Sequence, residues 1–163
     1  MKNVKPDLII GTTQPGAGAT NAVLMTMFAD LNLSENIPNT MFLYLHDEST
    51  PGQVMERLEK IIDDPEGMLL RYQQIGSRLL IPDLVGKTPE QIATTVKRVT
   101  DNLPSEVQLN VYADLQRTFK LGCTNGAGMV VPFSVETNDT MADALSGPNV
   151  RFRCAAMSTR LAE

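Results

Sequence analysis

The sequence predicts an α/β protein, a three-layer sheet with helices at the front of the chain and a more antiparallel β C-terminal third. Over the first hundred residues, short apolar runs typical of buried strands alternate with stretches of helical periodicity. Two capping boxes with proline at the first helical position mark helix starts in this part. In the last third, apolar and polar residues alternate along two segments, which favours strands with one solvated face.

Composition indicates one domain of ordinary size, which we expect to span 1–163. The chain has 163 residues, 42% of them apolar, which is enough for a sizeable core. Its net charge of −5 argues against a nucleic-acid partner or an anionic membrane surface. No apolar run approaches the roughly 18 residues that span a bilayer, and the N-terminal MKNVKPD lacks the pattern of a signal peptide. We therefore expect a cytoplasmic protein in which Cys123 and Cys154 are reduced.

The first predicted elements are a strand, a glycine-rich loop and a helix. Leu8, Ile9 and Ile10 form the short apolar run, and the helix is predicted over 20–31. Apolar residues cover most of the helix circumference, so we expect it to be buried nearly all round. A polar loop and a buried strand over 41–47 follow.

Two helices with matching N-termini come next. Thr50 with Gln53, and Thr88 with Gln91, form capping boxes in front of apolar stripes at helical spacing. A second short helix between 65 and 76 and a strand over 78–84 are predicted to separate them. The two segments resemble each other beyond their caps, either as a duplicated strand–helix unit or because good capping boxes look alike.

The C-terminal third is predicted to be mainly β. Residues 107–115 and 149–157 alternate between apolar and polar side chains, as antiparallel or edge strands do. A further strand over 126–135 contains Pro132, which cannot donate to a ladder and therefore indicates an edge or a bulge. One or two helical turns are expected over 140–145.

The glycine-rich loop from Gly11 to Thr20 (GTTQPGAGAT) is the principal candidate for a binding site. A glycine loop between a strand and a helix directs backbone N–H groups toward an anion at the helix N-terminus. The same composition also suits a plain turn that lets helix and strand pack closely. A standard Walker A loop is not present, because the spacing fails and the loop has no lysine.

The loop resembles the deviant Walker A loop of the partition- and conjugation-type ATPases, Lys-Gly-Gly-x-Gly-Lys-Thr. Residues 14–20 (QPGAGAT) match it at Gly16, Gly18 and Thr20, and depart from it at both lysines and at the first glycine. LHDESTPGQ is similar to that family's apolar strand with acidic residues and a glutamine, LLIPDLVG to its Walker B strand, and MVVPFS to a late strand that ends in proline. The resemblance covers roughly residues 7–135.

The resemblance implies a degenerate P-loop protein that binds a nucleotide with Mg²⁺. The residues it implies for the phosphates are Gly16, Gly18 and Thr20, and those for the metal are Asp47 and Asp83. Because Ala19 stands where a lysine reaches the outer phosphates, we expect hydrolysis to be absent or very slow. Lys87 is the basic residue that we expect to compensate for the missing lysine.

His46, Asp47 and Glu48 form the only histidine-centred group in the sequence. One histidine and two carboxylates can seat a divalent ion or relay a proton. Neighbouring residues on a strand point to opposite faces, so we interpret the group as a strand end that turns into a loop. Cys123 has no histidine nearby in the sequence and is not predicted to be a thiol nucleophile.

Two functions remain open, and neither requires a catalytic set. The first is a phosphate- or nucleotide-binding, pseudo-ATPase-like protein that acts within a larger assembly. The second is a structural self-assembling subunit, such as a coat, filament or secretion-complex component, without ligand chemistry. In either case we expect a homo-oligomer or protein partners. A third hypothesis, a flavin phosphate bound at Thr12 and Thr13, has few aromatic residues to support it.

Overall fold

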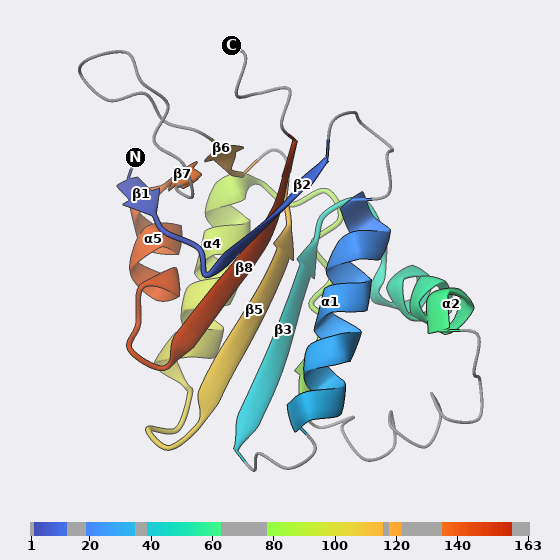
Figure 1. Cartoon of the computed structure of the whole chain (residues 1–163). Helices are drawn as coiled ribbons and strands as arrows, with labels where there is room; N and C mark the ends of the chain where they lie inside the picture. Colours follow the sequence, from blue (N-terminus) through green and yellow to red (C-terminus); the bar gives the residue numbers. More distant parts are fainter. Residues whose placement is uncertain are drawn as a thin grey trace.

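The computed structural model describes residues 2–12, 19–34, 39–62, 78–115, 118–121 and 135–157. Its centre is a five-stranded sheet of order β2-β8-β5-β3-β4, in which every neighbouring pair is parallel (Figure 1). The strands are β2 (Leu8–Thr12), β3 (Thr40–His46), β4 (Leu79–Leu80), β5 (Gln108–Asp114) and β8 (Val150–Met157). A second sheet of antiparallel pairs contains β1 (Lys2–Val4), β7 (Val135–Thr137) and β6 (Lys120–Leu121). The prediction of a mixed α/β protein is confirmed.

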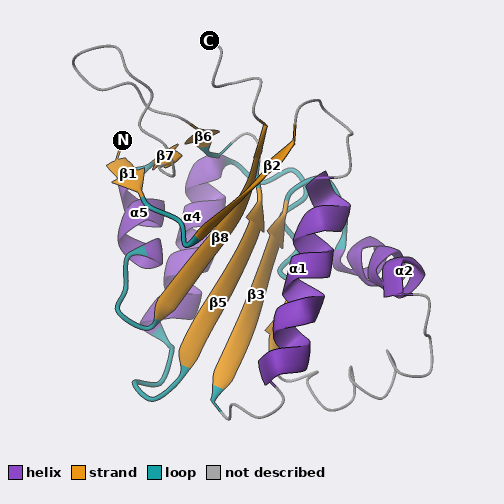
Figure 2. Ribbon diagram, in the orientation of Figure 1, coloured by secondary structure: helices purple, strands orange, loops and turns teal. Residues whose placement is uncertain are grey.

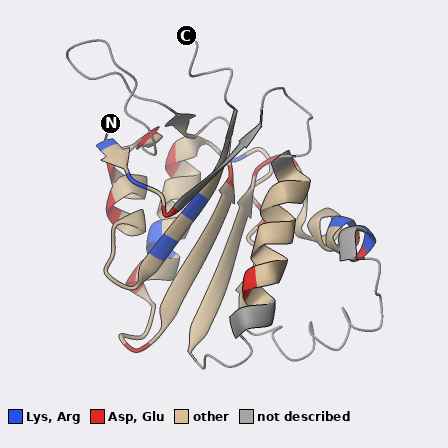
Figure 3. Cartoon of the chain, in the orientation of Figure 1, with Lys and Arg blue, Asp and Glu red and all other residues tan. Residues whose placement is uncertain are grey.

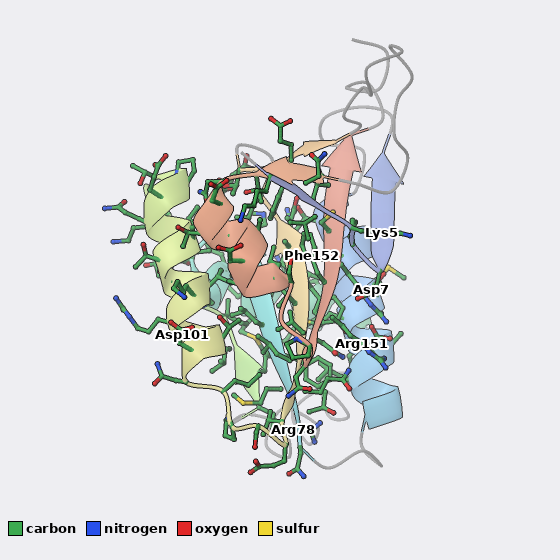
Figure 4. The ribbon with its side chains drawn as sticks, turned by 90° about the vertical axis from the view of Figure 1, so that its left-hand side faces the viewer. Lys5, Asp7, Arg78, Asp101, Arg151 and Phe152 are labelled. Atoms are coloured by element: carbon green, nitrogen blue, oxygen red, sulfur yellow. The ribbon has the colours of Figure 1, made fainter. Side chains whose placement is uncertain are left out.

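Helices lie on both faces of the large sheet (Figure 2). One face packs against α1 (Ala19–Ser34) and α2 (Pro51–Ile62), and we call it the α1 face. The opposite face packs against α4 (Pro89–Asp101) and α5 (Asp139–Leu145), and we call it the α4 face. Figure 4 shows the sheet edge-on, with α4 and α5 on one side of it and α1 on the other.

Alternation along the strands sends different residues to the two faces. The α4 face takes aliphatic side chains and one aromatic ring, among them Leu43, Leu45, Val111 and Phe152. The α1 face takes the larger aromatic rings of the strands, Phe42, Tyr44 and Tyr112. The α1 face therefore holds the hydroxyl groups of the sheet core, and these need polar partners.

Two expectations about the C-terminal third are wrong. Segments 107–115 and 149–157 form β5 and β8, which are parallel to each other and lie inside the sheet. The alternation in β5 does not mark a solvated face, because its polar side chains Asn110, Tyr112 and Asp114 are buried. α1 supplies partners for two of them, as described below. In the described part of this third, antiparallel pairing involves only β6 and β7.

Both predicted capping boxes are present. The Thr50 N–H donates to Gln53 Oε1 over 2.8 Å, and the Gln53 N–H donates to Thr50 Oγ1 over 3.3 Å. Thr88 and Gln91 exchange the same two bonds over 2.9 and 3.2 Å. Each box satisfies backbone N–H groups that the first helical turn leaves unpaired, and so sets where α2 and α4 begin.

Other predicted elements differ in detail. α1 is not buried all round, because Met25 is 57% exposed on its outer side. β4 has two residues where a strand over 78–84 was expected, and Pro82 beyond it cannot donate to a ladder. The expected helix between 65 and 76 and nearly all of the expected strand over 126–135 lie outside the described residues.

Candidate functional site

The neighbouring strands β3 and β5 lead to opposite faces of the sheet. β3 continues into α2 on the α1 face, whereas β5 continues through β6 and β7 to α5 on the α4 face. In open parallel sheets, such a switch in direction leaves a crevice outside the carboxyl ends of the two strands, and ligands bind there. The last residues of β3 and β5 are His46 and Asp114, which the register pairs directly.

Three polar side chains from three elements meet at this point. Thr20 Oγ1, in the first turn of α1, donates to Asp114 Oδ2 over 2.6 Å. His46 Nε2 lies 3.5 Å from the same carboxylate oxygen. His46 is 5% exposed and Asp114 4%, so the carboxylate relies on these two partners rather than on bulk water. We call Thr20, His46 and Asp114 the switch-point cluster.

Backbone groups hold the imidazole of His46 in place. Its Nδ1 accepts the backbone N–H groups of Glu48 and Ser49, each over 3.1 Å. Because Nδ1 acts as an acceptor, the ring proton of a neutral imidazole lies on Nε2, which faces Asp114. The ring of Tyr44 stacks on the imidazole, with centroids 6.1 Å apart and 14° between the planes.

The hydroxyl of Tyr44 is buried beside the cluster. It has no hydrogen-bond partner among the described residues. Burial raises the pKa of this phenol, the carboxylate of Asp114 raises it further, and the guanidinium of Arg57 lowers it. Charges from β5 and from α2 therefore act on the same buried hydroxyl. Such unpaired groups are uncommon in folded proteins, and the buried hydroxyls of Thr118 and Thr137 are further cases among the described residues.

The arrangement of the cluster favours metal or phosphate chemistry over nucleophilic catalysis. In a catalytic triad, the nucleophilic hydroxyl donates to the imidazole, which in turn donates to the carboxylate. Here the Thr20 hydroxyl donates directly to the carboxylate of Asp114, so the three groups do not form a triad. Carboxylate and hydroxyl oxygens are ligands that Mg²⁺ prefers, and Mg²⁺ commonly takes one or two carboxylates together with substrate phosphates. Within the described ranges, no three His, Cys, Asp or Glu side chains gather closely enough to hold a metal by themselves.

The residues predicted for the phosphates are only partly described. Gly16 and Gly18 lie outside the described residues. Thr20 is described and belongs to the switch-point cluster. Thr20 lies in the first turn of α1, which begins at Ala19, close to the predicted helix start, whereas its role with a phosphate stays a prediction.

The residues predicted for the metal and for the compensating charge lie around β3 and β4. Asp47 directly follows β3 and is 6% exposed. Asp83 and Lys87 are exposed in the segment between β4 and α4, where Asp83 Oδ1 accepts the Val85 N–H over 3.2 Å. β4 is the outermost strand, two places from β5, so these two residues follow a different strand end from Asp114. A metal held by Asp47 and Asp83 stays a prediction.

Sequence reasoning missed Asp114 as a site residue. It assigned the residue to a solvated face, because residues 107–115 alternate. One signal did point to it: Asp114 ends an apolar strand, much as Asp47 and Asp83 come at or after the ends of theirs. The carboxyl ends of parallel strands share one edge of a sheet, so acidic residues at several strand ends are candidates together.

Comparisons of the chain with protein-family models, with curated proteins and with solved structures find no match. The resemblance to deviant-Walker ATPases therefore stays a prediction. Among the described helices, none combines the length and the apolar character needed to cross a bilayer.

Proposed function

We propose that this chain binds the phosphates of a nucleotide together with Mg²⁺ at the carboxyl ends of β3 and β5, with little or no hydrolysis. The observation that carries the proposal is the 2.6 Å hydrogen bond from Thr20 Oγ1 to Asp114 Oδ2. It joins the first turn of a helix to a buried carboxylate at the place where open parallel sheets bind ligands. In P-loop proteins, a loop threonine and an aspartate together hold Mg²⁺.

Electrostatics favour an anion bound together with a cation. The N-terminus of α1 carries the positive end of the helix dipole, and its first turn has no acidic residue that would offset it. The buried carboxylate of Asp114 would repel a phosphate unless a divalent cation lay between them. Mg²⁺ supplies charge neutralisation of the phosphates when bound. In this proposal, Asp114 takes the metal role that the sequence assigned to Asp47 and Asp83.

The proposal gives the site a binding role rather than a catalytic one. The hydroxyl of Thr20 is engaged with a carboxylate, and the glycine loop has Ala19 where a lysine would stabilise the transferred phosphoryl group. Binding without turnover suits a chain whose bound nucleotide controls contacts with other subunits of an assembly. The proposed partners are therefore proteins, including further copies of this chain.

The test is thermal melting with ATP and Mg²⁺, added together and separately. With ligand at about 100 times its dissociation constant, binding stabilises by about 2.7 kcal/mol, which raises the melting temperature by about 5–10 °C for a chain of this length. Thr20→Val and Asp114→Asn should abolish the Mg²⁺-dependent part of that rise. Thr26→Val is the matched control, because the Thr26 hydroxyl donates to the Ala22 carbonyl within α1.

A melting curve that neither nucleotide nor Mg²⁺ shifts would contradict the proposal. If the melting temperature and the particle size then increase with protein concentration, the chain is the alternative, a self-assembling structural subunit. A yellow preparation with a flavin absorption spectrum would instead favour the flavin hypothesis.

A further inference from the structure

We propose that Arg57 supplies the positive charge that the glycine loop lacks, by contacting the outer phosphates of a bound nucleotide in a groove between α1 and α2. The inference rests on the function proposed above and assigns this role to Arg57 instead of Lys87. It follows from the lining of the groove, from the helices that border it, and from the buried phenol on which the charge of Arg57 acts.

The groove is polar and has a volume of about 590 Å³. It is lined by Asn21, Ser49, Gln53, Glu56, Arg57 and Lys60. Asn21 follows Thr20 in the first turn of α1, so the groove starts next to the switch-point cluster. Its volume falls in the range of small-molecule sites, roughly 300–1,000 Å³.

The groove begins at the N-termini of two helices and runs along α2 to Lys60 in its last turn. Asn21 is in the first turn of α1, and Ser49 and Gln53 flank the start of α2. Neither helix has an acidic residue in its first turn, whereas α4 and α5 have Glu90 and Asp139 there. An acidic side chain at a helix N-terminus offsets the positive end of the dipole. Because Asp114 accepts from Thr20 in the first turn of α1, its carboxylate offsets part of the α1 dipole, and that dipole favours an anion once a cation neutralises Asp114.

The side chains of α2 add net positive charge to the groove. Arg57 and Lys60 line it against one carboxylate, Glu56, and Figure 3 shows both signs of charge on this helix. An arginine can form two parallel N–H bonds to a phosphate, whereas a lysine acts as a point charge. Arginine is thus the better candidate for direct phosphate contact.

Arg57 is also the cation connected to the switch-point cluster. Its charge lowers the pKa of Tyr44, while the charge of Asp114 raises it, so both charges act on the same buried phenol. The Tyr44 hydroxyl is buried and has no hydrogen-bond partner among the described residues. Arg57 is therefore the cation of the groove lining whose charge acts on a side chain packed against the switch-point cluster.

The experiment measures the affinity of the full chain for ATP and ADP with Mg²⁺ by isothermal titration calorimetry. Arg57→Gln should weaken ATP binding about tenfold or more, and ADP binding less, because one charged hydrogen-bonding partner of the outer phosphates is lost. Lys87→Gln is the matched control and should leave both affinities unchanged. Both side chains are exposed, so neither substitution opens a cavity in the core.

A second pair of variants tests the charge of the groove itself. Glu56→Gln removes its one lining carboxylate and should tighten ATP binding about two- to fivefold. Glu59→Gln makes the same change on α2 at an exposed residue outside the lining, and should have no such effect. Equal effects of the two substitutions would show that ATP does not lie in the groove.

The outcomes separate this inference from the proposed function. If wild type binds ATP and Arg57→Gln binds it equally well, the inference is overturned while the proposed function stands. If Lys87→Gln alone weakens binding, the sequence-based expectation is right and the inference is wrong. If wild type binds neither ATP nor ADP, both the inference and the proposed function fail.

Discussion

At the scale of single residues, polar side chains between α1 and the sheet form two networks that tie α1 to the sheet. In the first, Asp114 accepts from Thr20 and faces His46. In the second, Asp30 of α1 accepts from the Tyr112 hydroxyl over 2.6 Å and pairs with Arg153. Each network gives a carboxylate that is largely shielded from water two polar partners. The polar half of β5 is thereby buried without leaving its charge unpaired.

Removal of the Asp30 side chain should destabilise the fold more than removal of an exposed polar side chain. We expect Asp30→Ala to lower the free energy of unfolding by about 2 kcal/mol, because the Tyr112 hydroxyl and Arg153 both lose their acceptor. The pair is 20% and 19% exposed, so solvent screening keeps the cost below that of a fully buried pair. Urea denaturation measures this loss in the free energy of unfolding.

The control for Asp30 is an exposed ion pair. Asp101→Ala breaks the Lys97–Asp101 pair on α4 and should change the free energy of unfolding by less than about 0.5 kcal/mol. Equal losses in the two variants would show that the Asp30 network contributes no more than a surface pair.

Cys154 should be an unreactive thiol in the folded protein. It is fully buried on β8, and burial raises its pKa to about 12. The thiolate is the reactive form, so a Cys123→Ser variant should react slowly with a disulfide reagent near pH 8 and quickly once unfolded. The raised pKa also means that the neutral thiol favours the folded state. That contribution is present below the unfolded pKa of about 8.5 and is lost as the pH rises toward 12. Fast labelling without denaturant would contradict the burial.

At the scale of elements, local chemistry sets where α2 and α4 begin. The capping boxes at Thr50 and Thr88 occupy the predicted positions, and Pro51 and Pro89 take the first helical places. The length of β4 was not predicted, because β4 pairs with β3 over two residues only and Pro82, which cannot donate to a ladder, follows it. Caps act within one turn of the chain, whereas the length of a strand depends on its neighbour.

Removing a capping hydroxyl should destabilise the protein by a predictable amount. Thr88→Ala is expected to cost about 1 kcal/mol, because the Gln91 N–H loses its acceptor. Thr94→Ala on the same helix is the control, since its hydroxyl bonds the Glu90 carbonyl and alanine is the better helix former. The free energies of unfolding of both variants can be compared by thermal melting. Similar losses at the two positions would contradict a specific capping role.

At the scale of the whole molecule, strand order creates the candidate site. β3 and β5 are neighbours although α2, β4 and α4 separate them in the chain. Their continuations diverge to the two faces, which leaves His46 and Asp114 at an open carboxyl edge. The N-terminus of α1 closes one side of that edge through Thr20. The melting experiment with ATP and Mg²⁺ tests this arrangement of strands and helix, because it measures whether β3, β5 and α1 bind one ligand together.

The candidate site could be predicted only in part. Thr20 was identified because a glycine loop before a helix is a local pattern. Its partner Asp114 lies 94 residues away, and no local pattern connects the two. Arg57 was not identified either, because a charged residue on an amphipathic helix is normally a solvated one. Its interest comes from the groove that it lines and from the effect of its charge on Tyr44.

By itself, the sequence determined the alternation of strands and helices in the first hundred residues and the starts of α2 and α4, since periodicity and capping act over a few neighbouring residues. Tertiary structure alone decided that β5 and β8 are parallel and interior. Alternation along a strand indicates that the two faces of the strand differ in polarity. It does not indicate that α1 covers the polar face of β5, where Asp30 accepts from Tyr112, 82 residues away in the chain. The same long-range packing brought Thr20, His46 and Asp114 together, because contacts between distant segments are selected by burial of the whole sheet and not by local preference.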